Sequence, residues 1–130
     1  MKPKISIAGL RVADMDRALA FYRDGLGFPV HNYTPGDSYV MLALEGPFLA
    51  LSVEAGGQDA AAGAATHRTW LSHNVAGPEA VRAVFDEAIA AGATPVHAPT
   101  AAPWGGHEAA FADPDGHVWD IAYNPFTDLT

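Results

Sequence analysis

The stretch Phe111-Ala112-Asp113-Pro114-Asp115-Gly116-His117-Val118-Trp119-Asp120-Ile121 predicts a strand, a tight turn and a second strand. Its Asp-Pro-Asp-Gly run is typical of a turn, because proline fixes φ, aspartate bonds to nearby backbone and glycine accepts positive φ. In the second strand, Val118 and Asp120 share one face while Trp119 and Ile121 share the other. A carboxylate in mid-strand indicates either a solvated face of the sheet or the wall of a wet or ligand-filled cavity.

The composition is that of an ordinary soluble globular protein. The chain has 130 residues, of which 49% are hydrophobic and 17% charged, so we expect one domain or two small modules that share a core. It has no cysteine, no apolar run long enough to span a membrane and no signal-peptide pattern at its start, which together favour a cytoplasmic protein. A net charge of −8, with only seven scattered Lys and Arg, argues against a nucleic-acid partner.

The order of predicted elements occurs twice. Asp14 is a good N-cap for a helix that glycines end near residue 27, and Gly77-Pro78 opens a second helix that Gly92 ends. Residues 99–106, rich in Pro and Gly, are expected to form a loop. The predicted strands cover residues 5–12, 28–33, 38–44 and 48–53 in the first half, and residues 69–75, 94–97 and both sides of the opening turn in the second.

We therefore expect two βαβββ modules, residues 1–54 and 68–130, joined by an Ala- and Gly-rich linker over residues 55–67. Residues as well as pattern repeat, since Pro29-Val30-His31 matches Pro95-Val96-His97. A unit of about 55 residues is too small to bury a core unaided, so the two modules should associate into one combined domain.

Two motifs resemble the vicinal oxygen chelate superfamily, which holds glyoxalase I, extradiol dioxygenases and the bleomycin- and fosfomycin-resistance proteins. They are Leu10-Arg11-Val12-Ala13-Asp14-Met15 with Phe21-Tyr22-Arg23-Asp24-Gly25-Leu26-Gly27-Phe28, and the opening hairpin. The resemblance implies an α+β fold in which two tandem βαβββ modules form a U-shaped eight-stranded sheet around a cavity, commonly in a homodimer. It fixes the fold better than the reaction, because one scaffold hosts unrelated chemistries.

In metal-dependent members of this superfamily, four strands each supply one ligand, usually His, Gln or Glu. The matching positions here are Ile7, Ala50, Trp70 (with Thr69 as its neighbour) and Asp120. Ile, Ala and Trp cannot donate a lone pair to a divalent cation, and one carboxylate does not hold a metal by itself. We therefore expect no metal ligands and no cofactor.

The six histidines could in principle supply a relocated metal site. No two of them show a spacing that places both imidazoles on one metal, and His73 is expected in the core with one satisfied nitrogen. His107 follows Trp104-Gly105-Gly106, where the backbone could approach a ligand closely, although a surface loop that uses glycine for its bend has the same pattern.

The residues expected on the cavity face mix an aromatic wall with hydrogen-bonding groups, as small-molecule pockets do. Asp120 is open to two interpretations: a structural ion pair with Arg11, or an unpaired carboxyl with a raised pKa that acts as a general acid or base. The candidate ligand-binding residues are Arg11, Trp70, Asn74, Trp104, His107 and Asp120.

Three functions follow as hypotheses. The first is a metal-independent protein that binds a small organic molecule, aromatic or planar, between the modules. The second is a metal-dependent lyase, isomerase or dioxygenase with a non-standard ligand set, which leaves open whether the protein is an enzyme. The third, a dimer-forming protein without a small-molecule role, has little support in the sequence. The expected partner is a small molecule, with no nucleic acid and no membrane.

Overall fold

A computed structural model of the chain describes residues 1–53, 69–114 and 116–130. The expected linker, residues 55–67, lies outside the described residues. The first half contains β1 (Ile7–Arg11), α1 (Met15–Leu19), η1 (Ala20–Gly25), β2 (Val30–His31), β3 (Tyr39–Ala43) and β4 (Phe48–Ser52). The second half contains β5 (Thr69–Asn74), α3 (Pro78–Ala90), β6 (Thr94–Ala101), β7 (His107–Ala112) and β8 (Val118–Tyr123).

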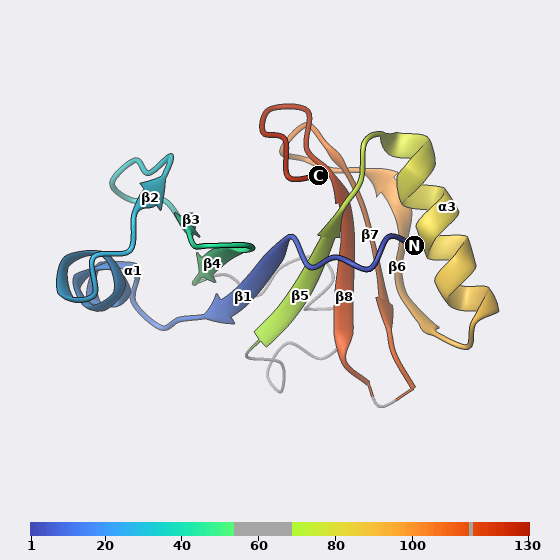
Figure 1. The fold of residues 1–130 in the computed structure, drawn as a ribbon, viewed down its shortest axis with the longest axis horizontal. Coiled ribbons are helices and arrows are strands. Elements are labelled where there is room, and N and C mark those ends of the chain that lie inside the picture. The colour runs from blue at the N-terminus through green and yellow to red at the C-terminus, as the bar shows by residue number, and fades with distance from the viewer. Residues whose placement is uncertain (54–68, 115) are drawn as a thin grey trace.

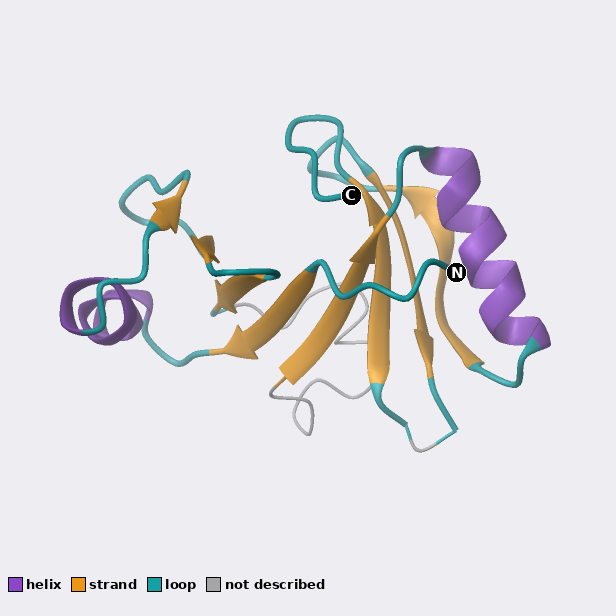
Figure 2. Ribbon diagram, in the orientation of Figure 1, coloured by secondary structure: helices purple, strands orange, loops and turns teal. Residues whose placement is uncertain are grey.

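The strands form one mixed eight-stranded sheet with the order β2-β3-β4-β1-β5-β8-β7-β6. The two halves meet at β1 and β5, which pair antiparallel in the middle, and each half repeats the same internal order of strands. The sheet is open rather than closed, and the two ends of the strand order lie on opposite sides of the molecule (Figures 1 and 2). This arrangement confirms the predicted α+β fold of two βαβββ modules.

The first helix differs from the single helix that the sequence predicts. Asp14 caps it as expected, since its carboxylate accepts a hydrogen bond from the backbone N–H of Arg17 at 3.1 Å. After Leu19 the helix widens into the π-helix η1, where the N–H of Leu26 reaches back five residues to the carbonyl of Phe21 at 2.9 Å. Gly27, with φ of 76°, then turns the chain away.

Strand β6 corrects the prediction of a loop from residue 99. It continues to Ala101 and runs through Pro95 and Pro99. The strand tolerates both prolines because it lies at the edge of the sheet and its register with β7 shifts twice, between Pro95 and His97 and between His97 and Thr100. The remaining loop is correspondingly shorter.

Both helices pack on the same face of the sheet. In the first half Leu19 packs with Val40 and Leu51, and in the second half Phe85 packs with Ile121. Alternate strand residues therefore point to the opposite face, which carries no helix among the described residues and which we call the helix-free face. Within the described ranges, no helix has the length and apolar character needed to cross a bilayer.

The hairpin between β7 and β8 has the predicted turn. The backbone N–H groups of Asp113 and His117 are both satisfied inside it, by the carbonyl of His117 and the carboxylate of Asp113, each at 2.9 Å. Gly116 has φ of 90°, which only glycine adopts without strain. The register it sets pairs Phe111 with Trp119, so Asp120 points to the helix-free face.

Candidate functional site

The four positions that match the superfamily's metal ligands lie in neighbouring strands on the helix-free face. Gly9 of β1 pairs with Ala50 and with Trp70, and Ser72 of β5 pairs with Asp120. Ile7, Ala50 and Trp70 are buried together in one apolar cluster that also contains Leu129. These side chains do not fit a divalent cation, because none offers an oxygen, nitrogen or sulfur ligand in place of the expected donors. The described residues contain no group of three or more His, Cys, Asp or Glu that could hold a metal ion.

Trp70 lies flat against the backbone of β1. A Cβ atom added at Gly9 would stand 2.2 Å from the indole, so only glycine leaves room for this ring. The guanidinium of Arg11 lies 5.7 Å from the centre of the same ring, within cation–π distance. The chain thus places an aromatic surface beside a positive charge on the helix-free face.

Asp120 is half-buried on this face, and it makes no hydrogen bond or salt bridge with the residues that the structure describes. Burial and the neighbouring Glu108 raise the pKa of its carboxyl to about 7, although the charge of Arg11 acts in the opposite direction. Of the two interpretations left open by the sequence, the geometry favours the carboxyl with a raised pKa. Near neutral pH this group can both accept and donate a proton.

Tyr39 of β3 belongs to the same group of side chains. Desolvation by the surrounding protein raises the pKa of its phenol, although 44% of the residue is exposed, and the charge of Asp120 raises it further. β3 and β8 are four strands apart in the sheet, a separation of about 19 Å in a flat sheet, where screened charges would hardly interact. The sheet therefore bends around the helix-free face, and Arg11, Tyr39, Glu108 and Asp120 converge there; we call these four residues the Asp120 group.

Trp104 contacts the Asp120 group through Glu108. Its indole N–H donates a hydrogen bond to the carboxylate of Glu108 at 3.2 Å, while 44% of the side chain is exposed. The ring folds over Gly106, where an added Cβ atom would meet it at 2.1 Å. Gly106 therefore leaves room for the Trp104 ring, a packing role that neither interpretation of this loop from the sequence included.

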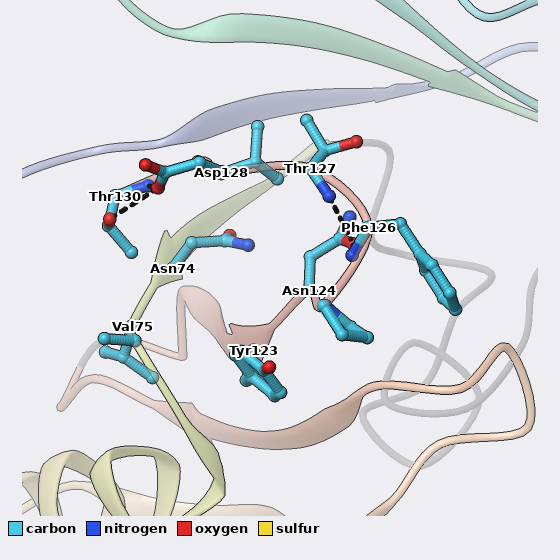
Figure 3. A pocket seen from close by; sticks show the side chains of 11 residues that line it. Asn74, Val75, Tyr123, Asn124, Phe126, Thr127, Asp128 and Thr130 are labelled. Carbon is cyan, nitrogen blue, oxygen red and sulfur yellow. Dashed lines mark hydrogen bonds between the residues drawn. The ribbon is translucent and has the colours of Figure 1, made fainter.

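Asn74 lies further along β5, in a separate pocket of about 320 Å³ (Figure 3). The segment after β8, residues 124–130, forms the other wall of this pocket. Leu129 of that segment reaches the apolar cluster beside Trp70, and Lys4 donates hydrogen bonds to the carbonyls of Leu129, at 3.1 Å, and Thr130. The 124–130 segment thus covers part of the helix-free face.

Two of the histidines, His107 and His73, lie apart from the Asp120 group. His107 lines a hollow of about 330 Å³ together with Arg82 of α3 and Thr100 of β6, away from the other candidate residues. His73 is buried, and its Nδ1 lies 2.8 Å from the carbonyl of Lys4, which agrees with the expected core histidine that has one satisfied nitrogen.

The structure brings Arg11, Trp70 and Asp120 together, adds Trp104 through Glu108, and leaves Asn74 and His107 elsewhere. The sequence reasoning missed Tyr39, Glu108 and the 124–130 segment. Strand alternation places Glu108 on the same face as Ala110 and could have found it, since Ala110 pairs with Asp120. Tyr39 lies near Asp120 only because the sheet bends, and the 124–130 segment reaches the site only because it packs over the sheet. Neither effect leaves a signal in the local sequence.

Comparison with known proteins supports the same fold. A family model described as the Glyoxalase/Bleomycin resistance protein/Dioxygenase superfamily matches residues 4–121. None of the curated proteins matches the chain in sequence.

Solved structures resemble the chain over most of its length. They include a structure described as NAD-dependent benzaldehyde dehydrogenase from Legionella pneumophila, with 19% identity, a TM-score of 0.73 and coverage of 90% of this chain and 96% of that one. Methylmalonyl-CoA epimerase from Streptomyces coelicolor has 17% identity, a TM-score of 0.66 and 96% coverage of both chains. A superfamily member from Vibrio splendidus has 18% identity, a TM-score of 0.65 and coverage of 93% and 100%.

At these identities the neighbours establish the fold and not the reaction. The family model, however, spans nearly the whole chain, and the strand order and the Asp-Pro-Asp-Gly hairpin agree with it. The protein belongs to the Glyoxalase/Bleomycin resistance protein/Dioxygenase superfamily.

Proposed function

We propose that this protein binds a small organic molecule with a planar or aromatic part on its helix-free face, without a metal ion. The observation that carries the proposal is the Asp120 group, in which a carboxyl with a pKa of about 7 stands near a guanidinium and a phenol. A half-buried ionisable group with a strongly shifted pKa and no structural partner is typical of a functional site.

Each neighbour has a role that follows from its chemistry. The indole of Trp70 is packed over Gly9 and is only 8% exposed, so it forms an apolar floor, and the 44%-exposed indole of Trp104 offers the surface on which a planar molecule stacks. Arg11 supplies a positive charge for a polar substituent of the ligand, and Trp104 extends the aromatic wall from the side of Glu108. Asp120 exchanges a proton with the bound molecule if the protein is an enzyme.

The metal-dependent alternative depends on ligands that these positions lack. Ile7, Ala50 and Trp70 form an apolar cluster, which favours burial of hydrocarbon and not of a cation. The proposal therefore routes no step through a metal, and the chemistry assigned to the face is binding and proton transfer by side chains alone.

Two measurements test the proposal. Native mass spectrometry of untagged protein, purified without chelator, should detect a bound or added planar aromatic molecule and no stoichiometric divalent metal. Trp104→Ala and Arg11→Gln should weaken the binding of this molecule about tenfold or more, whereas Asp86→Asn, an exposed change on α3, should not. Stoichiometric metal that restores an activity, or equal binding in all variants, would overturn it.

A further inference from the structure

The pocket beside Asn74 lies between the 124–130 segment and the ends of β5 and β8 (Figure 3). Its volume of about 320 Å³ is at the lower end of the range for small-molecule pockets. The lining residues are Asn74, Val75, Ala76 and residues 123–130. The function proposed for the Asp120 group does not use this space.

Asn74 is the polar group that points into it. The residue is 5% exposed, and its backbone N–H is satisfied by the hydroxyl of Ser6 at 3.0 Å. Its side-chain oxygen accepts a hydrogen bond from the hydroxyl of Ser72 at 3.3 Å, which leaves the amide Nδ2 turned toward the pocket without a hydrogen bond among the described residues. The Nδ2 atom opens to the pocket and is not sealed in the core, so it can donate a hydrogen bond to an acceptor atom of a bound molecule.

The 124–130 segment does not supply that acceptor, because its own polar groups bond to one another. The side-chain oxygen of Asn124 accepts from the N–H groups of Phe126 and Thr127, at 2.8 and 3.1 Å. The carboxylate of Asp128 accepts from the N–H and the hydroxyl of Thr130, at 3.0 and 2.6 Å. The segment therefore has a defined shape that walls the pocket and leaves Asn74 available.

Charge narrows the class of ligand. Asp128 lines the pocket as a carboxylate. The ammonium of Lys4 donates hydrogen bonds to the carbonyls of Leu129 and Thr130 in the same segment. The carboxylate of Asp128 repels an anionic ligand, and the ammonium of Lys4 offsets the attraction that this carboxylate would have for a cationic ligand. A neutral molecule with a strong hydrogen-bond acceptor fits both conditions.

We propose that the pocket between β5, β8 and the 124–130 segment binds a small neutral molecule through a carbonyl group, such as a carboxamide, which accepts a hydrogen bond from the amide Nδ2 of Asn74. The inference goes beyond the proposed function, because it requires no ligand at Asp120. The two sites are distinguishable, since the residues that surround them differ.

Three probes of one shape test the class of ligand. Benzamide, benzoate and benzylamine are titrated separately into ¹⁵N-labelled protein, and amide chemical shifts are followed. Benzamide should shift the amides of residues 74–76 and 124–130 in a saturable way. It should bind about tenfold more tightly than benzoate or benzylamine, because only benzamide combines a carbonyl with zero charge.

A matched pair of variants tests the role of Asn74. Asn74→Asp keeps the oxygen that accepts from Ser72 but removes the amide donor, so benzamide affinity should fall about tenfold. Asn32→Asp makes the same chemical change in the first module and should leave the affinity unchanged. The dispersed spectrum of each variant reports that it is folded, and Asn74→Ala repeats the test without the added charge.

Tighter binding of benzoate or benzylamine, or unchanged benzamide affinity in the folded Asn74 variants, would overturn the proposal. Shifts confined to residues around Arg11, Trp70 and Asp120 would also overturn it, while they would support ligand binding at the Asp120 group. Absence of any shift at saturating benzamide would rule out a carboxamide in this pocket and leave the Asp120 group to be judged by its own variants.

Discussion

Gly9 and Trp70 are in close contact on the helix-free face, because the indole occupies the space of a side chain at residue 9. Gly9→Ala should destabilise the fold by about 1–3 kcal/mol, since the added methyl group forces the ring or the strand to move. Urea unfolding measures this loss. In a Trp70→Ala background the same substitution should cost almost nothing, and an undiminished cost there would show that the ring is not the cause.

Asp120 gives the stability of the protein a specific pH dependence. Its folded-state pKa of about 7 lies above the ordinary value of 3.8, so the folded state binds the proton more tightly than the unfolded chain. Stability from this group is fully present below about pH 4 and is lost as the pH rises through about 7, by at most about 4 kcal/mol. Glu108 raises this pKa as well and Arg11 lowers it, while the charge of Asp120 in turn raises the pKa of the Tyr39 phenol.

Asp120→Asn removes this titration. The variant should gain stability relative to the wild type as the pH rises from 4.5 to 8, because it no longer buries a charge at high pH. Chemical denaturation of both proteins across this range measures the difference at each pH. A difference that stays constant between pH 4.5 and 8 would mean that the Asp120 pKa is not raised.

At the scale of elements, the 124–130 segment is fastened to the sheet by Leu129. This side chain is 7% exposed and packs in the cluster with Ile7, Ala50 and Trp70. Leu129→Ala should therefore destabilise the protein by about 2 kcal/mol or more. Phe126→Ala in the same segment is the control and should change stability by less than about 0.5 kcal/mol, because that ring is 75% exposed. Equal losses in thermal unfolding would assign Leu129 no special packing role.

At the scale of the whole molecule, β1 joins the two modules, because it pairs with β4 on one side and with β5 on the other. We expect both modules to unfold in one cooperative transition. Native-state hydrogen exchange should give the amides of Leu42 and Ile121, one from each core cluster, the same free energy of opening. A lower value for Leu42 alone would show that the first module opens independently. The homodimer that the superfamily resemblance implies stays a prediction.

The sequence by itself determined the two βαβββ modules, the hairpin turn, the face on which Asp120 lies and the apolar character of three metal-ligand positions. These features depend on local rules: strand alternation, turn residues and helix caps, all read within about ten residues of each other. These local rules did not predict the π-helix η1 or the full length of β6. The backbone hydrogen-bond pattern decides the π-helix, and the position of β6 at the edge of the sheet decides its length.

Only the tertiary structure decided how distant residues meet. The bend of the sheet brings Tyr39 to Asp120, and burial there, with the neighbouring Glu108, raises the pKa of its carboxyl to about 7. Leu129 reaches Trp70, and the 124–130 segment encloses Asn74, across fifty or more residues of sequence. Such encounters depend on sheet curvature and on the packing of a chain segment over it, which no local pattern encodes.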